Sequence, residues 1–108
     1  MHARVWQLQI RTGKVRDFQA ILSSVIDLAR QQGGYRGVLA FASGKSEAPD
    51  VTVVALWDSL QAMRASENNL FLTDTIARYL ACCEGLPHIT EQEILASDLI
   101  TASARAKA

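Results

Sequence analysis

Apolar residues recur along this chain with two different periods, and each period predicts one kind of element. In residues 3–10 they alternate with polar residues, so Trp6, Leu8 and Ile10 share one face of a predicted strand. In residues 14–32 they recur every three or four positions, which predicts an amphipathic helix. A glycine pair ends this helix, because glycine accepts the left-handed geometry in which many helices terminate.

The rest of the chain repeats this order of strand and helix. The predicted elements are a strand at 35–42, a polar hairpin loop at 43–50, a strand at 51–57, a second helix within 59–84 and a strand at 89–95. The order β-α-β-β-α-β predicts a ferredoxin-like α+β fold, with two helices on one face of a four-stranded antiparallel sheet. Residues 1–98 form the one predicted domain, and the small, polar residues 99–108 form a flexible C-terminal tail.

The second helix carries three local signals. Asp58 is suited to cap its start, with Gln61 at the spacing of a capping box. The paired asparagines within 67–69 favour a turn, which predicts an interruption of the helix there. Beyond that point the apolar stripe resumes and includes either Tyr79 or Leu80.

The third predicted strand indicates a partner. Residues 51–57 are apolar on both faces, which is typical of a strand that is covered on both sides. One layer of two helices covers only one face of a sheet. The other face must therefore meet something else, and a second copy of this chain is the simplest candidate. We expect a homodimer that forms through the sheet face.

Charge and cysteine content exclude several other partners. Eleven basic residues balance eleven acidic ones, so no positive field attracts nucleic acid. No apolar run reaches the roughly 18 residues of a membrane span, and the N-terminus lacks the apolar segment of a signal peptide. Cys82 and Cys83 are neighbours in a predicted helix and point apart, so they make a poor disulfide. A reducing cytoplasm fits best.

Three local motifs support a family resemblance. They are Gly34-Tyr35-Arg36-Gly37, Val54-Ala55-Leu56-Trp57-Asp58-Ser59 and Gln61-Ala62-Met63-Arg64. Together with the order of elements, they make residues 3–95 resemble the antibiotic-biosynthesis-monooxygenase-like (ABM) domains of the dimeric α+β barrel superfamily. The resemblance implies small domains that dimerise through their sheets. We expect a cavity between the helices and the sheet.

The resemblance also implies a chemistry. The cofactor-free monooxygenases of this kind oxidise an electron-rich phenol or anthrone directly with oxygen, and this chain matches them at Trp57. Those enzymes carry an asparagine four residues earlier, where this chain has Val53, and a tyrosine early in the second helix, where it has Met63. The leading hypothesis is a cofactor-independent monooxygenase acting on a small apolar aromatic compound. The alternative, favoured by Val53 and Met63, is a non-catalytic dimeric module that binds a small molecule or has a structural role.

Haem and metal chemistry are not expected. The haem-degrading relatives use an asparagine on the first strand, at about the position of Trp6, and a histidine on the second helix. Residues 59–84 contain no histidine, so the resemblance implies no axial haem ligand. No cluster of histidine and acidic residues has the spacing of metal ligands either. We therefore predict neither a cofactor nor a metal.

Three residues are candidates for catalysis. Trp57 could supply its indole N–H to a ligand, although a core aromatic residue gives the same pattern. Arg64 could pair with an acidic or phenolate substrate, or lie on a solvated helix face. Asn68, at the predicted helix interruption, could orient a ligand with its amide or simply form the turn.

Four more residues are candidates to line the cavity. They are Trp6, Phe41, Met63 and His88. Trp6 fits a core position equally well, as large aromatic residues often do. As a histidine, His88 could act as a base, but no acidic residue adjacent in the sequence orients it, so an exposed role also fits.

Overall fold

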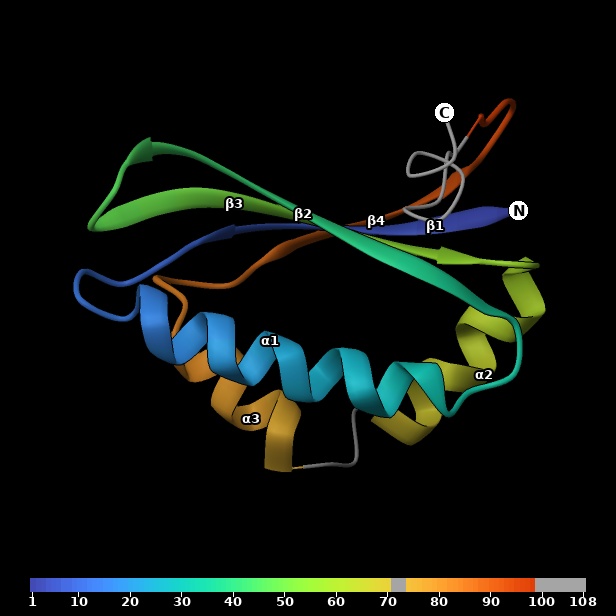
Figure 1. The fold of residues 1–108 in the computed structure, drawn as a ribbon, viewed down its shortest axis with the longest axis horizontal. Coiled ribbons are helices and arrows are strands. Elements are labelled where there is room, and N and C mark those ends of the chain that lie inside the picture. Colours follow the sequence, from blue (N-terminus) through green and yellow to red (C-terminus); the bar gives the residue numbers. More distant parts are fainter. Residues whose placement is uncertain (71–73, 99–108) are drawn as a thin grey trace, which may run out of the picture.

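The computed structural model describes residues 1–70 and 74–98, without the side chain of Leu70. The elements in chain order are β1 (His2–Gln9), α1 (Val15–Arg30), β2 (Tyr35–Lys45), β3 (Ala48–Trp57), α2 (Leu60–Leu70), α3 (Asp74–Ala81) and β4 (His88–Glu93). The strands form one antiparallel sheet in the order β2-β3-β1-β4, and the helices lie on one face of it (Figure 1). The predicted ferredoxin-like α+β fold is therefore confirmed.

The register of the sheet decides which side chains meet the helices. Trp6 of β1 lies opposite Val53 of β3 and Ile89 of β4. Residues that lie opposite one another in a sheet share a face, so alternate positions of β1 and β3 point together toward the helices. The buried members of the main core cluster are Leu8, Ile10, Phe18, Val51, Val53, Tyr79, Cys82 and Cys83. The core thus lies between the sheet and the helices.

The β2–β3 hairpin differs from the prediction. Residues 43–50 were predicted to form a loop, but β2 and β3 pair up to Lys45 and Ala48, which leaves a turn of two residues. β1 pairs with β3 only as far as Asp50, so the β2–β3 hairpin extends beyond the end of β1. Residues 43–47 at its end are exposed, which accounts for their polar composition, and the backbone N–H of Gly13 donates to the carbonyl oxygen of Glu47 at 3.2 Å. The prediction of a loop at residues 43–50 is therefore wrong, because most of these polar residues belong to paired strands.

The predicted interruption at 67–69 is also wrong in its position, because α2 continues through these residues. Asn69 Nδ2 donates a hydrogen bond of 3.0 Å to Gln32 Oε1 beyond the end of α1, and Glu67 pairs with Arg4 of β1. These contacts hold the segment in helical form. The helix pattern expected to resume at Leu72 falls partly outside the described residues.

The start of α2 is capped one residue later than predicted. Ser59 accepts a hydrogen bond of 3.1 Å from the backbone N–H of Ala62, which is the arrangement of an N-cap serine. Asp58 instead lies 3.2 Å from Arg36 in an ion pair. The backbone N–H of Asp58 donates to the carbonyl oxygen of Gly34 at 2.8 Å, which ties the end of β3 to the start of β2.

The two cysteines follow directly after α3 and are both buried and unbridged. Burial is the main cause that raises the pKa of each thiol above its usual value. Both thiols therefore stay protonated at neutral pH and behave as small apolar side chains. Arg11 Nε donates to the carbonyl oxygen of Cys83 at 2.9 Å, which joins the end of β1 to this segment.

Candidate functional site

A cavity lies between the helices and the sheet. The centre of a water molecule can occupy about 70 Å³ of it. One water needs about 10–15 Å³ by this measure, and an engineered apolar cavity of about 150 Å³ holds benzene. The space is therefore on the scale of a few waters or part of one small ring. Its lining residues are Arg4, Trp6, Leu22, Val25, Ile26, Ala29, Val38, Val53, Ala55, Trp57, Ser66, Glu67, Ile76 and Tyr79.

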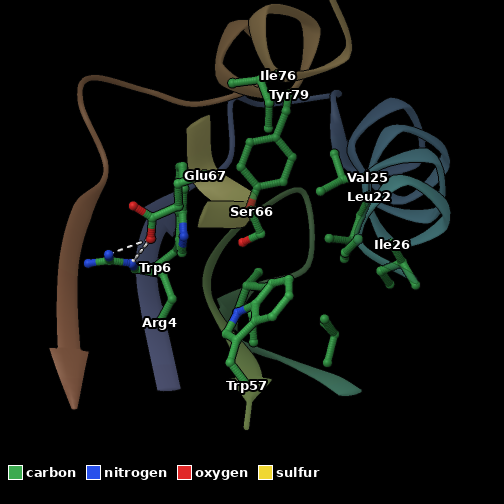
Figure 2. A pocket seen from close by; sticks show the side chains of 14 residues that line it. Arg4, Trp6, Leu22, Val25, Ile26, Trp57, Ser66, Glu67, Ile76 and Tyr79 are labelled. Atoms are coloured by element: carbon green, nitrogen blue, oxygen red, sulfur yellow. Dashed lines mark hydrogen bonds and ion pairs between the residues drawn. The ribbon is translucent and has the colours of Figure 1, made fainter. Parts of the chain in front are cut away.

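Apolar atoms make up almost all of the cavity wall. Leu22, Val25 and Ile26 contribute from one side of α1, and alternate residues of β1 and β3, with one residue of β2, contribute from the sheet (Figure 2). The apolar face of α1 and the apolar face of the sheet thus meet at this cavity. Such a concave apolar site with a few polar groups is the usual form of a small-molecule site.

Trp57 forms the wall of the cavity at the end of β3. Its side chain is 3% exposed, and its ring meets Tyr35 edge-on with centroids 5.7 Å apart. Gly34, with φ of 83°, brings β2 so close to α2 that a Cβ atom there would lie 2.5 Å from the Cβ of Ala62. The chain around Trp57 is therefore fixed by close packing, which fixes the position of its indole ring.

Tyr79 reaches the cavity from α3. Its ring packs edge-on against Trp6, with centroids 5.6 Å apart, and tilted against Phe18, with centroids 5.2 Å apart. The side chain extends toward Ser66 and Trp57 (Figure 2). The residue is 3% exposed, and burial, followed by the Cys83 thiol, raises the pKa of its phenol well above the usual value. Tyr79 is thus a neutral hydrogen-bond donor throughout the physiological pH range.

Ser66 brings a second hydroxyl to the cavity, from the middle of α2. Ser66 Oγ is buried and donates a hydrogen bond of 2.7 Å to the carbonyl oxygen of Met63. This back-bond satisfies the donor and leaves the lone pairs of the oxygen as acceptors. Ser66 therefore adds an acceptor to a wall that is otherwise apolar.

Charged groups close one side of the cavity. Arg4 Nε donates a hydrogen bond to Glu67 Oε1, and Arg4 Nη2 contacts the same oxygen (Figure 2). Arg4 Nη2 also lies 3.6 Å from Glu91 Oε2, and Arg64 Nη2 lies 3.3 Å from Glu91 Oε1. The side chains of Arg4 and Glu67 are only 14% and 25% exposed. Two arginines and two glutamates thus form a network without net charge.

The structure brings two of the predicted candidates together at this cavity. Trp57 and Trp6 both line it. Met63 is 0% exposed and packs against Trp57 and Ala29 in a second core cluster, beside the cavity rather than in its wall. A cavity between helices and sheet is therefore present and both tryptophans line it, while their roles there stay predictions.

Four other candidates lie outside the cavity, which corrects the expected set. Phe41 is 56% exposed on the face of the sheet that the helices do not cover, since it pairs with Thr52 rather than with Val53. Arg64 is directed to Glu91 on the outside of the molecule. Asn68 lies on the exposed side of α2, and His88 is exposed at the start of β4. None of these four side chains belongs to the wall of the cavity as described.

The sequence reasoning missed Arg4, Ser66, Glu67 and Tyr79 as cavity residues. A usable signal was present for two of them. Arg4 alternates with Trp6 and Leu8 on the apolar face of β1, and Ser66 follows Met63 by three residues on the buried stripe of α2. A polar residue at an apolar position of a periodic pattern is the kind of exception that marks a site.

Comparison with known proteins gives a fold likeness without a close sequence relative. No protein-family model matches the chain, and no curated protein matches it in sequence. SnoaB, a cofactor-independent oxygenase from Streptomyces nogalater, is 10% identical with a TM-score of 0.75, over 89% of this chain and 94% of SnoaB. This chain has the ABM-like fold.

Two further structures share the fold. A candidate antibiotic biosynthesis monooxygenase from Bordetella bronchiseptica is 16% identical with a TM-score of 0.74, over 88% of this chain and 97% of that protein. NE2512 from Nitrosomonas europaea, a protein of unknown function, is 19% identical with a TM-score of 0.69, over 94% and 95% of the two chains. At identities this low, the ABM-like likeness concerns the fold alone.

Metal ligands and membrane-spanning helices can be assessed for the residues that the structure describes. Among residues 1–70 and 74–98, no three histidine, cysteine, aspartate or glutamate side chains gather as metal ligands would. Within the same residues, no helix has the length and apolarity to cross a membrane. The predictions of no metal, no cofactor and a cytoplasmic location stay predictions.

Proposed function

We propose that this chain is a cofactor-independent monooxygenase that oxidises a small, apolar, electron-rich phenol in the cavity between helices and sheet. The observation that carries the proposal is the apolar cavity, which holds the buried donors Trp57 and Tyr79. The ABM-like fold, shared with the oxygenase SnoaB, supports it.

The chemistry needs little from the protein. The deprotonated phenol gives its electrons to oxygen; one oxygen atom forms a C=O bond at the opposite ring carbon, and the other leaves as water with the two hydrogens of the substrate. The protein must hold the ring in a dry space and stabilise the phenolate oxygen with fixed donors. The indole N–H of Trp57 and the hydroxyl of Tyr79 are donors of this kind.

The direct test is oxygen consumption by the purified chain. The panel contains phenol, 1-naphthol and anthrone, each with a hydrogen on the ring carbon that would be oxidised, and heat-inactivated protein gives the background. We expect turnover of at least one compound, and Trp57→Phe should lower it tenfold or more, the scale of a lost positioned donor. Tyr35→Phe is the matched control, because Tyr35 packs on Trp57 from outside the cavity. Oxygen uptake at the background rate with the whole panel would remove the proposal.

A non-catalytic role is the second candidate. Val53 lies in the cavity wall, where it can donate no side-chain hydrogen bond, and Met63 is fully buried beside Trp57. These are the two positions at which the resembling oxygenases carry polar residues. A chain that binds phenols but consumes no oxygen would support a small-molecule-binding module.

We further propose that the chain forms a homodimer through the sheet face opposite the helices. Leu39 and Phe41 lie next to each other on that face and are 47% and 56% exposed. Large apolar side chains gathered on one exposed face are typical of an interface. Light scattering at micromolar concentration should give twice the mass of one chain, and the mass of a single chain would contradict the proposal.

A further inference from the structure

The cavity between the helices and the sheet is closed at a size that does not admit an aromatic ring. The centre of a water molecule can occupy about 70 Å³ of it, whereas an apolar cavity that holds benzene has about 150 Å³. A ring can therefore enter only if part of the wall moves. The part that moves should be the one whose contacts with the rest of the molecule are weak.

The first half of α2, residues 60–63, is fixed by close packing. Met63 is 0% exposed and packs against Trp57. Gly34, just before β2, comes so near that a Cβ atom there would lie 2.5 Å from the Cβ of Ala62. A buried side chain and a backbone approach of this kind leave the start of α2 little room to shift.

The second half of α2, residues 64–69, has no such anchor. The structure describes all six residues, and the one apolar residue among them is an exposed alanine. Polar contacts hold this half instead. Arg4 of β1 binds Glu67 through Nε and Nη2, and Asn69 Nδ2 donates to Gln32 Oε1 at 3.0 Å. Polar contacts near the surface contribute less than a packed apolar side chain, so this half is held more weakly than the first.

A point at which helices bend lies where the two halves meet. Ser66 Oγ donates a hydrogen bond of 2.7 Å to the carbonyl oxygen of Met63, and back-bonds of this type compete with the backbone ladder of a helix. Ser66 is 2% exposed and lies in the cavity wall together with Glu67 (Figure 2). Movement of this half about Met63 would therefore uncover the cavity and leave the anchored first turn in place.

We propose that residues 64–69 form a hinged wall that swings away from the sheet to admit a ring, and that the Arg4–Glu67 pair is its latch. The two side chains of the pair are only 14% and 25% exposed. The other ion pair of this half, between Arg64 and Glu91, is more exposed and contributes less. A wall that closes again excludes water from the bound ring, which the oxidation proposed above needs. The inference deepens the proposed function by stating how its site is entered.

The first test measures how readily the wall opens. Ser66→Cys places a thiol of similar size at a position that only an open wall exposes. We expect iodoacetamide to label it at least tenfold faster than the native Cys82 and Cys83, which are buried elsewhere in the core. Met63→Cys, in the anchored half, should be labelled as slowly as the native cysteines. Mass spectrometry gives the rate at each thiol.

Two results of this labelling would overturn the inference. One is a thiol in Ser66→Cys that reacts as slowly as Cys82 and Cys83, because the wall would then open only when the whole chain unfolds. The other is equal labelling of Met63→Cys and Ser66→Cys, because α2 would then leave the sheet as a whole and not about a hinge.

Glu67→Gln tests the latch, because it removes the charge and keeps the size of the side chain. Combined with Ser66→Cys, it should raise the labelling rate about tenfold, the scale of a lost hydrogen bond between charged groups. The native cysteines should react as slowly as before. Asp27→Asn, which breaks an exposed pair with Arg30 on α1, is the matched control and should change none of the rates. Equal acceleration at all three thiols would overturn the latch, since it would reflect a general loss of stability.

A second measurement needs no introduced cysteine. 1-Naphthol is larger than the closed cavity, and its binding can be followed in a stopped-flow instrument through the tryptophan fluorescence. We expect the observed rate to level off with rising 1-naphthol concentration, because opening becomes limiting, and the plateau should rise about tenfold in Glu67→Gln. A rate that shows no plateau and does not respond to Glu67→Gln would overturn the inference.

The two measurements separate this inference from the proposed function. If 1-naphthol does not bind although Ser66→Cys is labelled as expected, the hinged wall stands and the proposed function loses its support. If phenols consume oxygen although Ser66→Cys stays unlabelled, the proposed function stands and the hinged wall is wrong.

Discussion

The two faces of the sheet carry similar large apolar side chains but have different surroundings. Trp57 on the helix-covered face is 3% exposed, whereas Leu39 and Phe41 on the other face are 47% and 56% exposed. The helices form one layer, so they bury one set of side chains and leave the other set on the surface (Figure 1). Apolar character along a strand therefore indicates that a face will be covered, but not by what.

The largest difference between the faces should appear when an aromatic ring is removed. Trp57→Ala leaves a hole beside Met63 and Ala29 and should lower the free energy of unfolding by about 3–5 kcal/mol. Phe41→Ala on the open face should cost less than about 1 kcal/mol in a dilute sample, because over half of that side chain is already in water. Urea unfolding monitored by circular dichroism measures both.

Protein concentration turns the same pair into a test of the dimer. If a second chain covers Phe41, the loss caused by Phe41→Ala should grow as the protein concentration rises, since association adds to the stability of the folded state. The loss caused by Trp57→Ala should depend far less on concentration. Equal losses for the two variants in dilute solution would contradict the contrast between the faces.

Sequence periodicity was enough for the fold but not for the site. The alternation in β1 and the three-to-four spacing in α1 gave the right elements, because burial on one side imposes those periods. Phe41 and Trp57 could not be separated in this way. Both sit on strands whose two faces are apolar, and only the pairing of β2 with β3 shows which face meets the helices.

Tyr79 shows the same limit on a helix. The apolar stripe fitted either Tyr79 or Leu80, because neighbours on a helix differ by only about 100° in direction. The structure buries Tyr79 at 3% exposure and leaves Leu80 at 37%. That choice depends on how α3 packs against Trp6 and Phe18, two residues far away in the sequence. The chemistry of the cavity rests on such long-range contacts.

A smaller effect should come from the close approach that positions Trp57 on the covered face. Gly34→Ala places a methyl group where only 2.5 Å is available to the Cβ of Ala62, at a φ of 83° that side chains rarely adopt. We expect a loss of about 1–3 kcal/mol in the free energy of unfolding. Gly33→Ala is the matched control, because a Cβ atom at Gly33 meets nothing within 4 Å. A loss from Gly33→Ala as large as that from Gly34→Ala would show that the contact with α2 does not matter.

The smallest effect is expected at the exposed ion pairs on the rim of the covered face. Arg64 donates a hydrogen bond to Glu91, and this bond is the main cause that holds the pKa of Glu91 below its usual value. A carboxyl whose pKa is lower in the folded chain stabilises the fold above its unfolded pKa, and that contribution is lost as the pH falls through the folded pKa. Arg64→Ala should therefore raise the pKa of Glu91 toward its ordinary value.

Titration of the Glu91 carboxyl carbon by NMR measures this change. The accompanying loss of stability should be small, because both partners are exposed to solvent, and it should be present near pH 7 and absent once Glu91 is protonated in both states. Arg30→Ala, which breaks an exposed pair with Asp27 on α1, is the control and should leave the pKa of Glu91 unchanged. A Glu91 pKa that stays low in Arg64→Ala would instead give Arg4 the main role, since Arg4 is the other arginine beside this carboxylate. In that case Arg4 in the cavity wall, and not Arg64 on the surface of α2, would be the main partner of Glu91.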